Sequence, residues 1–280
     1  MLKRTSPVVW NGNGPLDPEQ VASYDKRGFL LARDLLNLST ISELQAEVER
    51  IAASEPRAGT ILERDGVTVR SVFNVHNLSE KVSRDIAKNR RILDIAEQLL
   101  GPDLYVHQCH VNFKRPHTGG EYFWHSDFTF WYWEDGMCIP RAVSILLFLD
   151  NQRIETGPLY VVPGSHMWIT HDKWSREVKD HSDAVKHDLD GDPAKNGLVD
   201  LETLRTLTAD NEIEAILAKA GDVLFMDGNL VHASAPNLGC SSRRILLLIL
   251  NSMANQIGTP FSGQPPRPEY ISSRTFAALR

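Results

Sequence analysis

The segment "FWHSDFTFWYWEDG", residues 123–136, places His125 and Asp127 inside the most aromatic part of the chain. Eight of the twelve residues from Tyr122 to Trp133 are aromatic, although aromatic residues make up only 8% of the chain. Because an unpaired charge in an apolar strand is costly, a partner must compensate this pair. In a strand, residues two apart share a face, so we expect His125 and Asp127 to point the same way, with Ser126 opposite.

An imidazole beside a carboxylate can hold a divalent metal ion, and a third ligand must come from elsewhere. The best candidate is His232, in "MDGNLVHASAPN", directly after a segment typical of a buried strand. Two histidines and one carboxylate on one side of a metal form the facial triad of non-haem Fe(II) oxygenases, which leaves positions open for a co-substrate and oxygen. The alternative is a surface His–Asp pair without metal; the aromatic surroundings favour the metal site.

The other eight histidines are interpreted as hydrogen-bonded structural groups, among them His76, His107, His110 and His166. His107 and His110 are three residues apart in a predicted strand, so alternation puts them on opposite faces. We therefore expect them to make a poor pair of metal ligands.

Arg243 begins the apolar run "RRILLLIL", eleven residues after His232. An arginine entering such a strand is costly unless it meets an anion, and its planar guanidinium matches a carboxylate in a bidentate manner. This pattern predicts a contact with the distal carboxylate of a dicarboxylic co-substrate. The alternative is that Arg243 or Arg244 caps the strand edge in water.

Composition excludes several classes of protein. The chain has 280 residues, 42% of them hydrophobic, and a net charge of −6, which argues against nucleic-acid binding. Its three cysteines are widely spaced and form no C-x-x-C pair, which favours a reducing compartment. No apolar run is long enough for a signal peptide or a membrane span. We expect a cytoplasmic protein with no membrane contact, either a monomer or a homodimer.

The first hundred residues carry helix signals. Asp17-Pro18 is a good helix start, Thr40-x-x-Glu43 forms a capping box before a second helix, and Gly101 ends a third. Between them, "TVRSVFNVH" is typical of a strand. After Gly101 the pattern becomes β-rich, in "LYVHQCHVNFK", "AVSILLFLD", "GPLYVVPG", "GDVLFMD" and "RRILLLILNSM".

Short strands without intervening helices predict a sandwich or barrel. The expected fold class is mainly β with added helices. We expect a flexible N-terminal tail at residues 1–16 and a single domain at 17–280. Within that domain, the parts are helical support at 17–101, a jelly-roll core at about 102–255 with a polar, partly helical covering insertion at 167–220, and a C-terminal segment at 256–280.

Together these segments resemble the phytanoyl-CoA dioxygenase superfamily of Fe(II)/2-oxoglutarate-dependent oxygenases. Within it, the chain looks like hydroxylases of ectoine and of free L-proline or pipecolate. The resemblance runs from "GFLLARDLL" to "PPRPEY" through "RDGVTVRSVFNVH", "YVHQCHVNFK", "WHSDFTFWYWEDGM", "TGPLYVVPGSH" and "HASAPN". It implies a double-stranded β-helix (jelly roll, cupin-like) core with an N-terminal helical region. It also implies Fe(II), 2-oxoglutarate and O2 as cofactor and co-substrates.

The resemblance also implies roles for individual residues. The metal ligands and catalytic residues are His125, Asp127 and His232. The 2-oxoglutarate site comprises Arg243, Ser234, Gln108, Asn112, Lys114 and Ser144, and the substrate site comprises Trp131, Phe130, Arg70, Phe73 and Tyr122. Candidates for excluding water are Phe123, Trp124, Phe128, Phe130, Trp131 and residues 167–220. The candidates for binding a substrate carboxylate are Arg70, Arg115 and Arg141. As alternatives, Lys114 and Arg70 are ordinary strand charges and Trp131 is a core residue.

These roles predict hydroxylation of an unactivated C–H of a small free amino acid of the L-proline or L-pipecolate type, with release of succinate and CO2. Ectoine hydroxylases carry Glu-Thr-Trp after H-x-D-Phe, whereas this chain has Thr129, Phe130 and Trp131. Phe130 therefore favours proline-type substrates, with ectoine 5-hydroxylation as the alternative, or another natural-product hydroxylation. The retained Asp127 favours hydroxylation over halogenation.

Two alternatives come from other classes of protein. A zinc hydrolase could use the same three ligands, but it lacks an obvious general base and leaves Arg243 unexplained. In a non-catalytic metal-binding jelly roll, the complete triad together with Arg243 would have no catalytic role.

Overall fold

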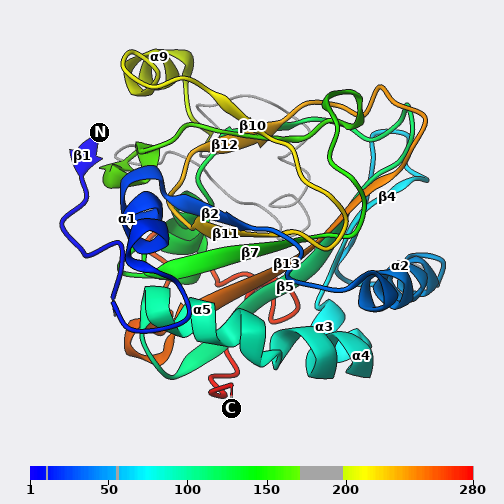
Figure 1. Cartoon of the computed structure of the whole chain (residues 1–280), viewed down its shortest axis with the longest axis horizontal. Helices are drawn as coiled ribbons and strands as arrows, with labels where there is room; N and C mark the ends of the chain where they lie inside the picture. The colour runs from blue at the N-terminus through cyan, green and yellow to red at the C-terminus, as the bar shows by residue number, and fades with distance from the viewer. Residues whose placement is uncertain (11, 55–56, 171–197, 280) are drawn as a thin grey trace.

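The computed structural model describes residues 1–10, 12–54, 57–170 and 198–279, and its centre is a seven-stranded antiparallel sheet (Figure 1). The strand order is β2 (Phe29–Ala32), β11 (Val223–Asp227), β7 (Ala142–Phe148), β13 (Arg243–Ser252), β5 (Leu104–Lys114), β4 (Val69–Phe73) and β3 (Thr60–Leu62). A second sheet, in the order β10 (Glu214–Ile216), β8 (Leu159–Val161), β12 (His232–Ser234) and β6 (Tyr122–His125), lies over one face. β1 (Leu2–Lys3) pairs with β9 (Trp168–Ile169). The prediction of a mainly β fold with added helices is confirmed.

Helices cover the other face of the seven-stranded sheet (Figure 1). The α-helices are α1 (Pro18–Arg27), α2 (Leu38–Ala52), α3 (Val75–Leu78), α4 (Glu80–Val82), α5 (Arg90–Leu100), α6 (Asp127–Phe130) and α9 (Leu201–Leu207). The π-helices are η1 (Ser83–Ala87) and η2 (Trp131–Asp135), and the 3-10 turns are η3 (Ile154–Thr156), η4 (Ser165–Met167) and η6 (Met253–Asn255). None of the helices in the described ranges is long and apolar enough to cross a membrane.

The helix boundaries follow the capping signals, with one correction. Asp17 caps α1 through a capping box with Gln20, and Gly101 ends α5 at φ 91°. The cap of α2 is Asn37 and not Thr40 as expected, because the Asn37 side chain accepts a hydrogen bond from the Thr40 N–H at 2.8 Å. The helix therefore begins at Leu38, before the predicted capping box.

The two faces of the seven-stranded sheet carry different side chains. Val111 of β5 belongs to the apolar core shared with the helices, whereas Gln108 lines a cavity on the face toward the four-stranded sheet. A bulge between β5 and β13 makes His107 an extra residue in the ladder. The expected alternation of His107 and His110 is therefore wrong: His107 lies edge-on to Trp131, with ring centroids 5.4 Å apart, and His110 lines the same cavity as Trp131.

The N-terminal segment differs from the expected flexible tail. Arg4 is buried and its Nη1 lies 2.7 Å from Asp227 Oδ2, at the end of β11. Val8 is buried in the core beneath the helices. The segment is ordered because it satisfies a buried charge and adds β1 to β9. In the expected insertion, α9 and β10 are described, whereas the expected cover at residues 171–197 lies outside the described residues.

Candidate metal centre and substrate cavity

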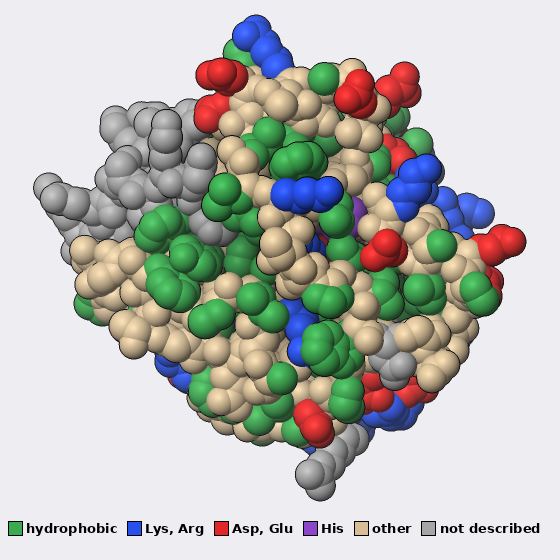
Figure 2. Space-filling view, turned by 90° about the vertical axis from the view of Figure 1, so that its left-hand side faces the viewer, with side chains coloured by type: hydrophobic (Ala, Val, Ile, Leu, Met, Phe, Trp, Pro, Cys, Tyr) green, Lys and Arg blue, Asp and Glu red, His purple; other side chains and the backbone are tan. Residues whose placement is uncertain are grey.

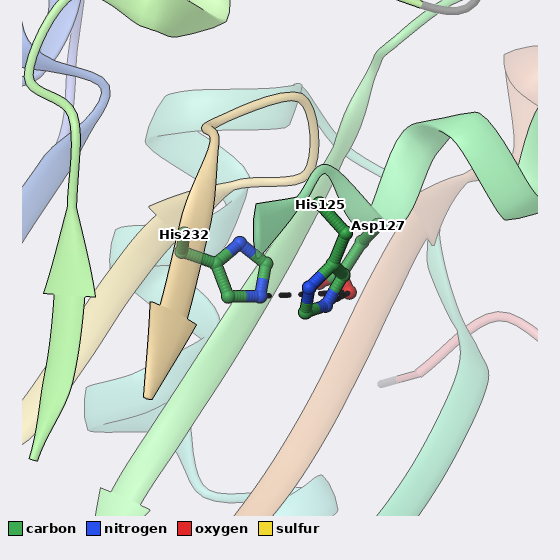
Figure 3. A group of neighbouring side chains, drawn as sticks. All are labelled: His125, Asp127 and His232. Atoms are coloured by element: carbon green, nitrogen blue, oxygen red, sulfur yellow. Dashed lines mark ion pairs between the residues drawn. The ribbon is translucent and has the colours of Figure 1, made fainter. Parts of the chain in front are cut away.

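The three predicted metal ligands converge between the two sheets (Figure 3). His125 is the last residue of β6 and His232 is the first of β12, and antiparallel pairing sets them opposite each other. Asp127 Oδ1 lies 3.7 Å from His125 Nε2 and 3.9 Å from His232 Nε2. One ligand atom from each residue lies within 4.8 Å of the others, so a single ion can reach all three.

The local conformation of the H-x-D segment differs from the expectation of one continuous strand. The strand ends at His125, Ser126 is still extended (φ −114°, ψ 137°), and Asp127 begins α6. The Phe128 N–H donates to the Gly228 carbonyl at 2.8 Å, which ties this turn to the loop before His232. The side chains of His125 and Asp127 therefore meet across a strand-to-helix turn and not along one strand face.

Hydrogen bonds orient all three ligands. His125 Nδ1 lies 2.6 Å from the Phe123 carbonyl and His232 Nδ1 lies 2.9 Å from the Leu230 carbonyl, so each ring donates from Nδ1 and keeps the Nε2 lone pair for a metal. The Ser144 hydroxyl donates to Asp127 Oδ2 at 2.7 Å. Burial, together with the neighbouring His125, lowers the pKa of His232 to about 4 and keeps it in the neutral form that metals bind.

A cavity opens from these ligands between the two sheets. Its volume is about 140 Å³, well beyond the roughly 10–15 Å³ that one water occupies on the same measure, so it has room for small molecules. On the face in Figure 2, hydrophobic side chains gather around a hollow in which basic and histidine side chains are visible. Besides the three ligands, the polar residues and aromatic residues of its lining are Arg70, Ser71, Phe73, Gln108, His110, Asn112, Tyr122, Phe130, Trp131, Ser234, Arg243 and Arg267.

Arg243 is a buried cation in the cavity wall, at the start of β13. Its Nε and Nη2 donate to the Gly157 carbonyl at 3.2 and 2.7 Å, and burial lowers its pKa to about 10. Among the described residues, no carboxylate lies within ion-pair distance of it. Arg244 instead binds Asp150 at 2.7 Å and Glu49 at 3.1 Å. The buried position and missing counter-ion of Arg243 fit an anionic ligand.

The other predicted co-substrate residues occupy three different positions. Gln108, Asn112 and Ser234 line the cavity. Lys114 lies behind Ser234 and donates to its hydroxyl at 2.8 Å; burial first, then the charge of Arg243, lower its pKa to about 5. Ser144 is absent from the lining of the cavity, and its hydroxyl contacts Asp127 instead.

The predicted cations for a substrate carboxylate are not brought together. Arg70 lines the cavity, but it lies 3.1 Å from the buried Glu63 carboxylate. Arg115 pairs with Glu49, and Arg141 donates to the Leu100 carbonyl; neither lines the cavity.

Arg267, from the C-terminal segment, is a cavity residue that the sequence did not single out. Its Nε and Nη2 bind the buried Asp135 at 2.9 and 2.5 Å. No local pattern indicated it, because "PPRPEY" carries no catalytic signature. His110 was also missed, although its spacing of two from Gln108 and Asn112 could have placed it in the cavity wall.

The predicted aromatic substrate residues line the cavity as a group. Trp131 is buried at the start of η2, where a side chain added at Gly228 would clash with it. The Phe130 ring lies 5.9 Å from that of His125, centroid to centroid. Tyr122 lies beneath the Arg70 guanidinium, 3.8 Å from its ring centroid. Of the aromatic residues expected to exclude water, Phe130 and Trp131 line the cavity, whereas Phe123, Trp124 and Phe128 do not.

The donor set fits iron(II). Two neutral imidazole nitrogens and one carboxylate oxygen lie on one side, and the cavity leaves the opposite side open for further ligands. The serine on Asp127 Oδ2 leaves Oδ1 directed toward the two imidazoles.

Comparison with known families and relatives agrees with this chemistry. The model of the family "Phytanoyl-CoA dioxygenase (PhyH)" matches residues 24–245. An ectoine dioxygenase of Nocardia farcinica is 35% identical over 281 residues, covering 99% of this chain and 91% of the relative. An ectoine dioxygenase of Bordetella bronchiseptica is 36% identical over 288 residues, covering 100% and 91%.

Solved structures of an enzyme with bound 2-oxoglutarate or Fe are also similar to this chain. EctD from S. alaskensis with 2-oxoglutarate and 5-hydroxyectoine has a TM-score of 0.86 and 31% identity, covering 100% of this chain and 93% of EctD. The structure of the same enzyme with bound Fe has a TM-score of 0.84 and 31% identity, covering 99% and 92%. The carbocyclase SnoK of nogalamycin biosynthesis, at 19% identity and a TM-score of 0.63, shares the fold.

Proposed function

The chain belongs to the phytanoyl-CoA dioxygenase family and is an Fe(II)/2-oxoglutarate-dependent dioxygenase, and we propose that it hydroxylates ectoine. The observation that carries the substrate proposal is the sequence identity of 35–36% across the whole chain to the ectoine dioxygenases of Nocardia farcinica and Bordetella bronchiseptica. The observation that supports the dioxygenase reaction is that His125, Asp127 and His232 line the same cavity as the buried Arg243.

Each part of the cavity has a task in this proposal. His125, Asp127 and His232 hold iron(II), and Arg243 binds the distal carboxylate of 2-oxoglutarate, assisted by Ser234. With O2, the iron and 2-oxoglutarate supply the oxidising power that inserts a hydroxyl at an unactivated C–H, with release of succinate and CO2. Phe130 and Trp131 keep water from the reacting atoms. Arg70 and Arg267 also line the cavity, and each pairs with a buried carboxylate, Glu63 and Asp135 respectively.

Ectoine replaces the proline- or pipecolate-type substrate that the sequence favoured. That expectation depended on Phe130 and Trp131, whereas the similarity to ectoine dioxygenases extends over the whole chain. Ectoine, proline and pipecolate share a carboxylate and a protonated ring nitrogen group, so the same cavity charges suit all three. Phe130, which lines the cavity, keeps a cyclic amino acid as the second candidate.

A substrate panel tests the proposal. Purified protein loaded with Fe(II) is given 2-oxoglutarate, O2 and either ectoine, L-proline, L-pipecolate or no substrate, and succinate and hydroxylated product are measured together. We expect ectoine to stimulate succinate release and to gain one oxygen atom. Product from pipecolate or proline alone would make the second candidate correct. Zn(II)-loaded protein is the control and should be inactive.

A further inference from the structure

The turn at residues 227–230, which follows β11, contacts both parts of the metal centre. Its Leu230 carbonyl accepts the hydrogen bond that orients the His232 ring, 2.9 Å from Nδ1. Its Gly228 carbonyl accepts at 2.8 Å from the N–H of Phe128, the residue that directly follows the carboxylate ligand in the chain. A shift of the 227–230 turn would therefore displace two of the three metal ligands.

Asp227 closes this turn and also leads away from it. The Leu230 N–H donates to the Asp227 carbonyl at 2.9 Å, and the Asn229 N–H donates to its side-chain Oδ1 at 2.9 Å. The other carboxylate oxygen, Oδ2, lies 2.7 Å from Nη1 of Arg4, and both side chains are buried. One aspartate thus shapes the turn with one oxygen and binds the N-terminal segment with the other.

Arg4 joins the ends of two neighbouring strands. Its Nη2 donates to the Pro140 carbonyl at 2.7 Å, two residues before β7 begins. Because β7 pairs with β11, the guanidinium connects both strands at their metal-centre end. β7 also carries Ser144, whose hydroxyl donates to Asp127 Oδ2 at 2.7 Å. Arg4 is therefore linked to Asp127 through one strand and to His232 through the other.

The N-terminal segment holds the guanidinium in one position. Nε of Arg4 donates to the Ser6 hydroxyl at 3.0 Å, and Nη2 also donates to the Pro7 carbonyl at 3.0 Å. The preceding residues are fixed as well, since β1 pairs with β9. A planar guanidinium held in this way imposes a fixed distance between the groups it contacts, here the Asp227 carboxylate and the Pro140 carbonyl.

We propose that Arg4 is a positioning residue for the metal centre: it holds the 227–230 turn against the start of β7, so that His232 and Asp127 keep the spacing that binds iron(II). Arg4 is absent from the lining of the cavity, so it acts through Asp227 and through β7. The inference rests on the proposed iron ligands. It goes beyond the proposed function because it does not depend on which substrate is hydroxylated.

The first experiment measures iron affinity without turnover. Anaerobic protein is titrated with Fe(II) in competition with a chelator. Arg4→Gln keeps a donor for the nearby carbonyls but loses the ion pair with Asp227, and we expect its Kd for Fe(II) to rise about tenfold. At saturating Fe(II), the visible band of the complex with 2-oxoglutarate should also move in wavelength, because the ligands are displaced. A Kd and a band equal to those of the wild type would overturn the inference.

Arg33→Gln is the matched control. Nη1 of Arg33 lies 2.8 Å from Asp222 Oδ2, and Asp222 directly precedes β11. The two arginines thus bind aspartates at opposite ends of one strand, and Arg4 lies at the end next to the metal centre. Arg33→Gln removes a partly exposed ion pair and should change the Kd for Fe(II) by less than about twofold.

A second control separates positioning from stability. Leu44 is buried in the core formed with α2, away from the 227–230 turn, and Leu44→Ala should destabilise the fold by leaving a cavity. Measured below its unfolding temperature, this variant should bind Fe(II) as the wild type does. If Leu44→Ala or Arg33→Gln weakened iron binding as much as Arg4→Gln, the role of Arg4 would be structural only and the inference would be wrong.

Hydrogen exchange locates the change within the fold. In iron-free Arg4→Gln, we expect faster exchange than in the wild type in peptides covering residues 127–130 and 228–231, with unchanged exchange in the ladder of β5 and β13. Equally faster exchange in both regions would indicate a general loss of stability and contradict the inference. Asp227→Asn keeps an acceptor for the Asn229 N–H and removes the charge that Arg4 binds, so it tests the inference if Arg4→Gln does not fold.

Iron binding and turnover separate this inference from the proposed function. Wild type that binds Fe(II) but does not hydroxylate ectoine overturns the proposed substrate, while the Arg4 comparison still decides the inference. Wild type that hydroxylates ectoine, with iron affinity unchanged in Arg4→Gln, overturns the inference alone. Wild type that does not bind Fe(II) overturns both.

Discussion

The two walls of the cavity are built in different ways. The wall from the seven-stranded sheet rests on β5 and β13, strands of 11 and 10 residues that pair along their whole length. The wall from the four-stranded sheet carries two metal ligands on β6 and β12, strands of 4 and 3 residues. Long ladders hold the side chains that we propose to contact the organic ligands, whereas the metal ligands lie on short strands that need support from other segments.

The support for the short strands comes from the loop before His232. Gly228 accepts from the Phe128 N–H, and Asn229 donates to the His166 carbonyl at 2.8 Å. Asp227 binds the buried Arg4 of the N-terminal segment. Ladder hydrogen bonds are therefore sufficient to orient the long wall, while specific loop contacts orient the short one.

Removing a ligand from the short wall should have the largest effect. With His232→Ala, we expect bound iron to fall from roughly one per chain to near zero and turnover to fall by more than about a thousandfold, because two ligands leave the triad incomplete. Metal analysis and succinate release measure both. His117→Asn, in an exposed loop, is the control and should retain iron. An iron-loaded, active His232→Ala variant would contradict the assignment.

Removing the buried cation of the long wall should affect the co-substrate and spare the metal. With Arg243→Ala, we expect KM for 2-oxoglutarate to rise on the order of a hundredfold, because a buried carboxylate contact is lost, while iron content stays unchanged. The neighbouring Arg244→Ala removes a cation that pairs with Asp150 and Glu49, and it should change this KM less than about twofold. Equal effects of the two variants would contradict the assignment of Arg243.

Breaking the ion pair between Asp135, at the end of the aromatic segment, and Arg267 should lower the stability of the protein. Asp135 is fully buried between Arg267 and His107, and although burial opposes it, the charge of Arg267 holds the Asp135 pKa well below its ordinary value of 3.8. Asp135→Asn removes the nearer counter-ion of the buried Arg267 and leaves it only Glu134 at 3.6 Å, and we expect it to lower the free energy of unfolding at pH 7 by about 3–5 kcal/mol in urea denaturation.

The contribution of Asp135 to stability should also depend on pH in one direction. A carboxylate with a lowered folded pKa stabilises the protein above its unfolded pKa, and that contribution is lost as the pH falls. The difference between wild type and Asp135→Asn should therefore be constant near neutrality and narrow below about pH 3.8. Asp94→Asn removes an exposed ion pair with Arg90 and should cost less than about 1 kcal/mol. If the difference in unfolding free energy between wild type and Asp135→Asn increased as the pH fell, the predicted direction would be contradicted.

Removing the hydrogen bond that orients the metal ligand Asp127 should have the smallest effect on activity. Ser144→Ala removes the donor to Asp127 Oδ2, and we expect the dissociation constant for Fe(II) to rise about tenfold to a hundredfold. Competition with a chelator measures it. KM for 2-oxoglutarate should stay close to the wild-type value, because Ser144 is not part of the cavity lining. A large change in that KM without a change in iron affinity would instead support the role that the sequence implied.

Much of the fold was predictable because its signals are local. The helix starts and stops at Asp17 and Gly101 follow from capping, and the long strands β5, β7 and β13 follow from apolar runs. The predictions were wrong where the structure of a segment depends on contacts with residues far away in the sequence. The sequence indicated a free tail, yet Arg4 finds Asp227 more than two hundred residues away. Alternation also failed for His107, because the bulge that displaces it depends on the register with β13.

The sequence by itself determined the reaction class: an H-x-D pair among aromatic residues, a distal histidine and an arginine entering an apolar strand. The tertiary structure decided the geometry. It put Asp127 on a helical turn, moved Ser144 from the cavity to the Asp127 carboxylate, and brought His110 and Arg267 into the cavity wall. The physical reason is that ligand chemistry depends on residue type, which the sequence states directly. Which side chains share a cavity depends on strand register and loop contacts, which form only when the sheets pair.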